Sequence, residues 1–471
     1  MAAGFPHRDN PDTGQERVFS QSENCVEIRR DDLGPEEQEI FRRFADQVQG
    51  VRGDLPPEEM LQMLRRELGT DDREDAWMGQ AYVRIGIVGS SGAGKSTFIN
   101  SFRGLEASDP GAADVGTTET TRETAEYPHP EHDHVILVDF PGALFKLQEE
   151  NWHPVTFNME EYRVRFGGKM KECNVFLVFT SERVHDNAVW IAKVAKDMGK
   201  KVLFVRSKFD RDLEDKQRDK RSYFAGGQKE GEERLLQEHR EDYVTKLDTL
   251  GYGRVDIRDV FVISGILEHV QTGHWDAAAL KEAILKQLDI QQKMLLMTTT
   301  TDYSPTMVRV KAEIYRSRAW KVALTVAAGG LIPLAGTFIN AGTMVTTMAL
   351  FKKGFGLYPT SVRKLAKLTG KDEGELQRFV DDRLSIVSYV EQFLEREIDL
   401  QTLTRALVAA NASLNILMTA MAVDSAVDFY LPFVGGLVTA PFSFSLAWHA
   451  LRLVIDQYEQ CALALHEFAF R

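Results

Sequence analysis

The chain contains few cysteines and has no excess of positive charge. Three of its 471 residues are cysteines, and Cys25, Cys173 and Cys461 lie far apart, so neither a disulfide framework nor a Cys-x-x-Cys metal site is expected and a reducing compartment fits. Asp and Glu outnumber Lys and Arg by 70 to 57, which gives a net charge of −13. A general nucleic-acid binder needs a basic surface for phosphate, so no nucleic-acid partner is expected.

The chain also lacks a secretory signal and internal repeats. Its N-terminus is polar, so no signal peptide is expected, and no repeating period indicates a solenoid. Hydrophobic residues make up 43 % of the chain, which is enough for sizeable cores. A length of 471 residues corresponds to about three domains.

The stretch GSSGAGKSTFIN, residues 89–100, has the pattern of a phosphate-binding loop between a strand (82–88) and a helix. Gly89, Gly92 and Gly94 permit backbone angles that a side chain would forbid, and the N–H groups of the loop then form an anion nest at a helix N-terminus. Lys95 is placed to reach the β- and γ-phosphates, and Ser96 to ligate Mg²⁺. The predicted nucleotide-binding residues here are Gly89, Ser91, Gly92, Ala93, Gly94, Lys95, Ser96 and Thr97.

Because ATPases and GTPases share this loop, the preferred nucleotide base must be inferred from another part of the sequence. The apolar run KVLFVRSKFD, residues 201–210, ends in Ser207, Lys208 and Asp210. A carboxylate at Asp210 can accept hydrogen bonds from the N1–H and 2-amino group of guanine, a donor pair that adenine lacks. The stem of Lys208 would lie over the ring, and Ser207 supplies a hydroxyl where the usual motif has Asn or Thr. This pattern favours GTP and GDP as the nucleotides.

Two further strands end in residues that complete such a site. HVILVDFPG, residues 134–142, is a strand ending in Asp-x-x-Gly, in which Asp139 would hold Mg²⁺ through water and the Gly142 N–H would sense the γ-phosphate. DVFVISG, residues 259–265, ends in Ser264 and Gly265, whose main-chain atoms could contact the nucleotide base. The order of the four motifs is typical of a GTP-binding G domain.

The pattern of elements predicts an α/β fold class. Alternating strand and helix signals indicate a P-loop G domain at 79–290, with three layers and a mostly parallel sheet. Residues 1–33 are predicted to be a mobile tail, 34–78 to form two amphipathic helices, and 291–471 to be helical. The two helical segments are expected to pack into one domain built from both chain ends.

Two charged segments inside the α/β part are interpreted as surface features. The highly charged stretch that follows the base motif, residues 210–234, is predicted to be a surface loop. The histidine cluster HPEHDH, residues 129–134, is interpreted as a solvated turn between two strands in preference to a metal site.

Two uncharged stretches, 322–351 and 429–450, leave a choice between buried and membrane-associated helices. The first is long enough to span a bilayer and is flanked by basic residues, among them Arg316 and Arg318. Its Gly and Pro residues near the middle favour two shorter helices joined by a turn, which are buried or dock reversibly on a membrane. Stable spanning of the bilayer is the alternative.

The motifs together resemble those of the immunity-related GTPases, the interferon-inducible family with dynamin-like behaviour. The resemblance covers roughly residues 35–465 and rests on GAADVGTTETTRETAEYPHP, which resembles the family's switch I, on DFPG, on FVRSKFDRD and on FGL at 355–357. It implies a homodimer through the nucleotide face, with Glu119 in the contact as a catalytic residue. It also implies a switch threonine on Mg²⁺, either Thr121 or Thr118, with Thr121 preferred as a metal-binding and catalytic residue. Val115 stands where relatives carry Thr, and the start Met1-Ala2 lacks the myristoylation signal of some relatives.

The predicted function is GTP hydrolysis, slow in a monomer and accelerated by self-assembly. Ala143 and Leu144, which follow the Asp-x-x-Gly motif, cannot polarise an attacking water, so a switch residue, a partner or a second copy must supply the missing group. The resemblance implies an oligomeric, cytoplasmic protein of innate immunity that docks peripherally on intracellular membranes. The alternatives are a nucleotide-binding scaffold with little hydrolysis and an integral membrane-remodelling GTPase.

Overall fold

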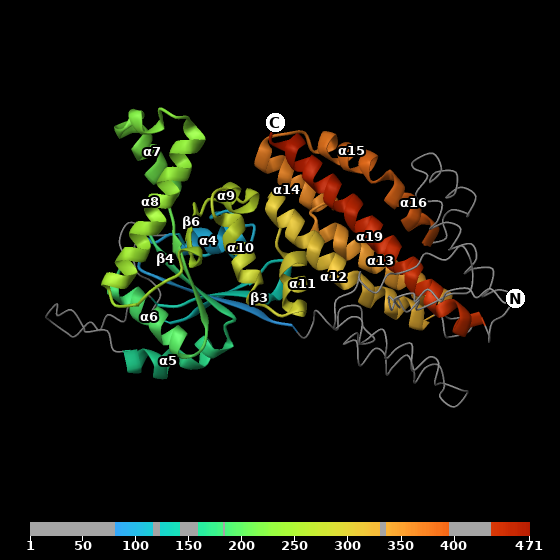
Figure 1. The fold of residues 1–471 in the computed structure, drawn as a ribbon, viewed down its shortest axis with the longest axis horizontal. Helices are drawn as coiled ribbons and strands as arrows, with labels where there is room; N and C mark the ends of the chain where they lie inside the picture. The colour runs from blue at the N-terminus through green and yellow to red at the C-terminus, as the bar shows by residue number, and fades with distance from the viewer. Residues whose placement is uncertain (1–80, 116–122, 142–158, 182–183, 330–335, 395–434) are drawn as a thin grey trace, which may run out of the picture.

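The structure is a computed structural model that describes residues 81–115, 123–141, 159–181, 184–329, 336–394 and 435–471. The predicted tail and the two predicted N-terminal helices, 1–33 and 34–78, lie outside these residues. The described residues form an α/β region and, beside it, a helical region (Figure 1).

A six-stranded, mostly parallel sheet lies at the centre of the α/β region. Its order is β2-β3-β1-β4-β5-β6, and only the β2–β3 pair is antiparallel. Strands covered on both faces need continuous apolar runs, and that is the sequence feature by which the strands other than the antiparallel edge strand β2 were predicted. The strands are β1 (Val83–Gly89), β2 (Ala125–His129), β3 (His132–Asp139), β4 (Val175–Thr180), β5 (Lys201–Arg206) and β6 (Val260–Val262).

Helices cover both faces of this sheet, and alternate strand residues face the two layers. One face packs against α4 (Lys95–Phe102), α9 (Leu267–Thr272) and α10 (Ala277–Leu285). The other packs against α5 (Met159–Glu172), α6 (Asp186–Asp197) and α8 (Gln228–Thr249). The predicted mixed α/β fold with a mostly parallel sheet is therefore confirmed.

The helical region follows along the chain, and no strand occurs in its described residues. The helix α19 lies along α12, with α13 beside them (Figure 1). The apolar core on the α4 side of the sheet continues without a break into these helices, so the two regions share one hydrophobic core. The helices are α11 (Ile290–Thr299), α12 (Pro305–Gly329), α13 (Gly336–Gly354), α14 (Pro359–Thr369), α15 (Glu373–Arg383), α16 (Ser385–Leu394) and α19 (Gly435–Ala469).

The described parts of the uncharged stretch 322–351 belong to α12 and α13, and the turn predicted between them at its Gly and Pro residues lies outside the described residues. The helix α12 ends at Gly329 and α13 begins at Gly336. Within the described part of the chain, none of the helices combines the length and the apolar character that crossing a membrane requires. The flanking Arg316 pairs with Asp456 and Glu459 of α19, and Arg318 is buried.

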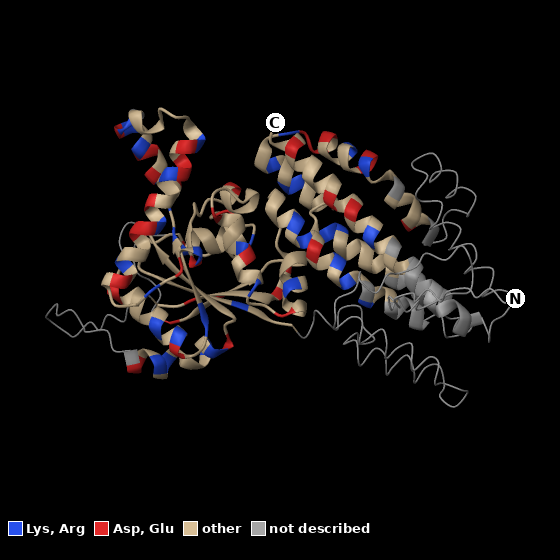
Figure 2. Ribbon diagram, in the orientation of Figure 1, with Lys and Arg blue, Asp and Glu red and all other residues tan. Residues whose placement is uncertain are grey.

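The predicted surface loop at 210–234 is wrong, because this segment is mostly helical. It forms α7 (Phe209–Asp219), a short 3-10 helix η2 (Arg221–Phe224) and the start of α8. Oppositely charged or polar residues four apart support α8, among them Glu230 with Arg234 and Asp242 with Lys246. Figure 2 shows both signs of charge spread along α7 and α8. The segment was predicted to be a loop because it is highly charged and has only a narrow apolar stripe. The charges in fact stabilise the helices by local pairing.

The histidine cluster at 129–134 spans the turn of the β2–β3 hairpin at Pro130 and Glu131, so the predicted turn between two strands is confirmed, but His129 is buried and not solvated. Glu131 at its tip pairs with Lys364 of α14 at 2.7 Å and with Lys353 of α13 at 3.5 Å, so the hairpin contacts the helical region. The ligand atoms of His132, Asp133 and His134 lie within 4.8 Å of one another, but the Asp133 side chain is 86 % exposed and exposed groups of this kind are common without an ion.

His129 in this hairpin should make the fold sensitive to acid. Burial lowers the pKa of its imidazole from 6.5 to about 4, and its Nδ1 accepts a hydrogen bond from the Glu131 N–H. Between these two values the unfolded chain binds a proton that the folded chain does not, so the free energy of unfolding falls as the pH drops below 6.5. From pH 7 to pH 5 this histidine should account for a loss of about 2 kcal/mol.

Urea unfolding at the two pH values, compared between the wild type and His129→Gln, measures this effect. Glutamine keeps an acceptor but has no titrating proton, so the variant should lose less stability on acidification. Equal pH dependence in the two proteins would contradict the prediction. His239, whose pKa burial also lowers to about 4, should maintain part of the dependence in both.

Candidate nucleotide-binding site

The predicted phosphate loop lies between the end of β1 and the start of α4. Gly92 and Gly94 have φ of 74° and 81°, a left-handed conformation that glycine adopts without strain. Two of the glycines are also needed for close approach. A Cβ on Gly89 would lie 2.4 Å from the Phe179 carbonyl oxygen, and one on Gly94 would lie 3.1 Å from the Ser207 hydroxyl. Ser91 and Gly92 are exposed at the outer turn, whereas Ala93 is buried beneath it.

Lys95 is the first residue of α4, and its ammonium group folds back over the loop. The Nζ donates hydrogen bonds to the carbonyl oxygens of Gly89 at 2.9 Å and Ser90 at 3.3 Å. Ser96 and Thr97 follow in the same helical turn and are half-buried. A cation and the N-terminus of a helix therefore face the same place, an arrangement that attracts anions.

Asp139 ends β3 in the strand next to β1, where it pairs with Ile87 in the parallel register. Its side chain is buried, and among the described residues its Oδ1 has no hydrogen-bond partner. Burial raises the pKa of this carboxyl to about 6, and the positive charge of Lys95 partly opposes that rise. A buried acceptor without a partner is costly on its own, so the site fits a bound cation with its water shell.

The base motif follows β5 and is tied to the phosphate loop by Ser207. The Ser207 hydroxyl donates to the Ala93 carbonyl at 2.7 Å, with the Thr180 carbonyl at 3.1 Å. Lys208 has a φ of 64°, unusual for a residue other than glycine, and this turn starts α7 one residue later. Asp210 thus lies in the first turn of α7, half-buried.

Ser264 and Gly265 follow β6 and contact the helix that begins with Lys95. Ser264 is buried and its Oγ accepts from the Ile266 N–H at 3.3 Å. The Gly265 carbonyl accepts from the Ser101 hydroxyl of α4 at 2.7 Å, across 164 residues of sequence. All four predicted segments therefore meet at the carboxyl edge of one parallel sheet, where open α/β folds bind ligands. Three predicted residues, Glu119, Thr121 and Gly142, lie outside the described part of the chain.

Comparison with known proteins identifies the family to which these motifs belong. The family profile described as "Interferon-inducible GTPase (IIGP)" matches residues 76–425. The chain belongs to this family. Its resemblance to the immunity-related GTPases is therefore confirmed, and it is a GTP-hydrolysing enzyme.

The relatives of this GTPase are distant in sequence. The chain is 27 % identical to mouse "Interferon-gamma-inducible GTPase 10" over 63 % of its own length and 66 % of the relative. It is 26 % identical to rat "Interferon-inducible GTPase 5" over 91 % of its length and 83 % of the relative. It is 34 % identical to rat "Immunity-related GTPase family M protein", over 29 % of the chain and 31 % of that relative.

The sequence analysis did not identify two buried polar residues at the end of α4 of this GTPase. Asn100 exchanges two hydrogen bonds with the backbone of Ala113, at 2.9 and 2.6 Å. Arg103 donates to the carbonyl oxygens of Gly111 and Pro128, both at 2.9 Å. These contacts hold the predicted switch segment, 111–130, near its two ends. The only sequence feature that could have indicated these two residues is their position on the apolar side of a short helix.

Proposed function

We propose that this GTPase binds GTP and GDP with Mg²⁺ at the edge formed by the four loops. The observation that carries the proposal is the convergence on one edge of the sheet of Lys95, the Asp210 turn and the Asp139 carboxylate, whose Oδ1 has no partner among the described residues. The α/β region would be the G domain, with residues 34–78 and 291–471 forming one helical domain.

Each residue then has a defined role. The loop amides and Lys95 would bind the phosphates, with Gly142 sensing the γ-phosphate. Asp210 would read guanine beneath Lys208, with Ser207, Ser264 and Gly265 shaping the pocket. Ser96, Asp139 and Thr121 would hold Mg²⁺, which when bound neutralises charge on the phosphates. These side chains and amides orient the nucleotide, but Ala143 and Leu144 supply no group that could orient water.

We infer that a second copy supplies what a monomer lacks. Facing nucleotide sites would bring Glu119 of each copy into the contact and raise the rate of hydrolysis. Peripheral docking on an intracellular membrane, in cell-autonomous defence, is the cellular setting that we propose. Because Arg316 and Arg318 are engaged within the fold, this docking would depend on the uncharged segments and not on those flanking charges.

The test is GTP turnover per molecule at rising protein concentration, with Lys95→Ala as the blank. Specific activity should climb with concentration, and Glu119→Ala should flatten the curve while leaving the affinity for GTP unchanged. A flat curve near the blank, with GTP still bound, would contradict assembly-driven catalysis. It would instead favour the scaffold alternative, which the exposed Val115 in place of threonine supports.

A further inference from the structure

The short helix α9 connects the candidate nucleotide site with the helical region. It begins two residues after Gly265, whose carbonyl is held by Ser101 of the phosphate-loop helix α4. At its other end, the Gln271 carbonyl accepts a hydrogen bond from the N–H of Tyr303, two residues before α12. The helix α9 therefore links the base loop directly to the start of α12.

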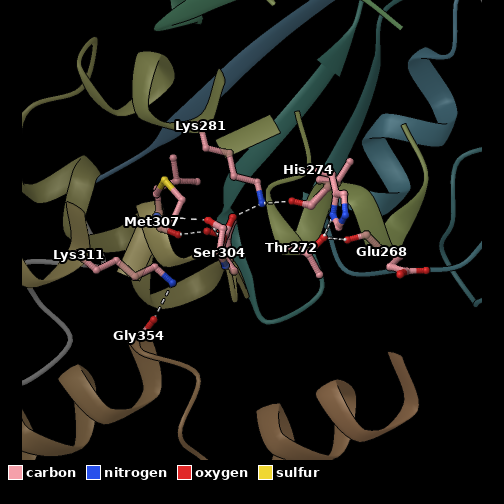
Figure 3. A network of polar contacts seen from close by, with 12 residues as sticks. Glu268, Thr272, His274, Lys281, Ser304, Met307, Lys311 and Gly354 are labelled. Carbon is pink, nitrogen blue, oxygen red and sulfur yellow. Dashed lines mark hydrogen bonds and ion pairs between the residues drawn. The ribbon is translucent and has the colours of Figure 1, made fainter. Parts of the chain in front are cut away.

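A buried ion pair fixes the far end of α9. Lys281 of α10 donates to the Val270 carbonyl of α9 at 2.6 Å and pairs with Asp302, and both charged side chains are almost fully buried. The second carboxylate oxygen of Asp302 accepts from the N–H and the hydroxyl of Ser304, at 2.8 and 2.6 Å. The Ser304 hydroxyl accepts in turn from the Met307 N–H in α12, so one carboxylate joins α9, α10 and the start of α12 (Figure 3).

The residues around this ion pair are tightly packed. Gly273 directly follows α9 with a φ of 72°, and a Cβ there would lie 2.5 Å from the Cβ of Ser304. Thr272 at the end of α9 donates to the Glu268 carbonyl and contacts the His274 ring, as Figure 3 shows. The residue after α9 therefore lies directly against the residue before α12, with no room for a side chain between them.

We propose that Lys281 and Asp302 are positioning residues for the guanine nucleotide: their ion pair holds α9, and through it the Ser264–Gly265 loop and α4, in the binding position. This inference rests on the proposed role of those loops. A buried ion pair contributes little net stability compared with apolar residues of similar size, whereas its geometry can select one register. Replacing both charged residues together should therefore affect nucleotide release more than folding, whereas removing one partner alone would leave a buried charge unpaired and destabilise the fold.

The double variant Lys281→Met, Asp302→Asn tests this separation. It removes both charges together, and asparagine keeps the oxygen that caps Ser304 and α12. The fluorescent GDP analogue mant-GDP reports release in stopped-flow experiments, and thermal unfolding reports the fold. We expect release to be faster on the order of tenfold, with a melting temperature within a few degrees of the wild type.

Two matched controls show whether the effect belongs to α9. Lys311→Met removes another buried lysine, whose Nζ donates to the Gly354 carbonyl at 2.7 Å and whose charge also lies near Asp302 and Lys281, but it leaves the Lys281–Asp302 pair in place. Glu131→Gln breaks ion pairs at another contact between the two regions, away from α9. Both should leave mant-GDP release unchanged. Faster release in Lys311→Met equal to that of the double variant would overturn the proposal, because the cause would then be general loosening.

The remaining outcomes are also decisive. Wild-type release from a folded double variant overturns the positioning role, whereas a wild type that fails to bind mant-GDP overturns the proposed nucleotide site itself. If the double variant does not fold, hydrogen exchange of the wild type with and without GDP replaces it. GDP should slow exchange at 267–272 and 303–308, and protection confined to the nucleotide loops would overturn the coupling.

Discussion

Replacing Asp210 with Asn should change the base preference of the protein from guanine to xanthine. The carboxylate can accept from both N1–H and the 2-amino group of guanine, whereas an asparagine amide offers one acceptor and one donor. Xanthine carries a carbonyl in place of the amino group and so pairs with that donor. A site built around buried hydrogen bonds rejects a mismatched partner strongly, so GTP affinity should fall roughly 10⁴-fold while XTP affinity rises.

Competition between GTP, XTP and ATP for one fluorescent nucleotide measures this change in preference. Asp215→Asn is the matched control, because it makes the same chemical change in the same helix at an exposed residue paired only with Arg218 among the described residues. This control should bind GTP as the wild type does. Unchanged GTP binding by Asp210→Asn would place base recognition elsewhere and remove the strongest reason for assigning Ser207 and Lys208 to the base.

Most of the α/β region could be predicted from the sequence because each of its strands and loops depends on residues that are neighbours in the sequence. A parallel strand covered on both faces must be a continuous apolar run, and the residues that end β1, β3, β5 and β6 must then share one edge. The glycines at 92 and 94 were predicted correctly for the same reason, since their backbone angles exclude most other residues.

The features that sequence reasoning missed depend on partners far away in the chain. A polar pattern does not distinguish Lys281 and Asp302, which are buried, from surface charges. Arg316 was interpreted only as a basic residue flanking the uncharged stretch 322–351, but it pairs with Asp456 on α19, 140 residues later. The α7–α8 segment was wrongly predicted to be a loop for a local reason. Its many charges stabilise helices through interactions between residues four apart.

Lys95→Ala should abolish most GTP hydrolysis through the loss of one charge aimed at the phosphates. Removing a single preorganised group of this kind lowers kcat/KM by roughly 10²- to 10³-fold. The fold should survive, because among the described residues the Lys95 ammonium group donates hydrogen bonds to two loop carbonyls of a half-buried turn. Thermal unfolding should therefore be nearly unchanged.

The same variant should also make nucleotide binding more dependent on pH. The positive charge of Lys95 lowers the pKa of Asp139, which burial raises to about 6. Without the lysine this pKa should rise further, so more of the carboxyl is protonated near neutral pH and cannot hold a cation. The affinity of Lys95→Ala for mant-GDP with Mg²⁺ should therefore fall more steeply between pH 8 and pH 6 than that of the wild type. An equal loss at both pH values would mean that Asp139 does not hold Mg²⁺ in its ionised form.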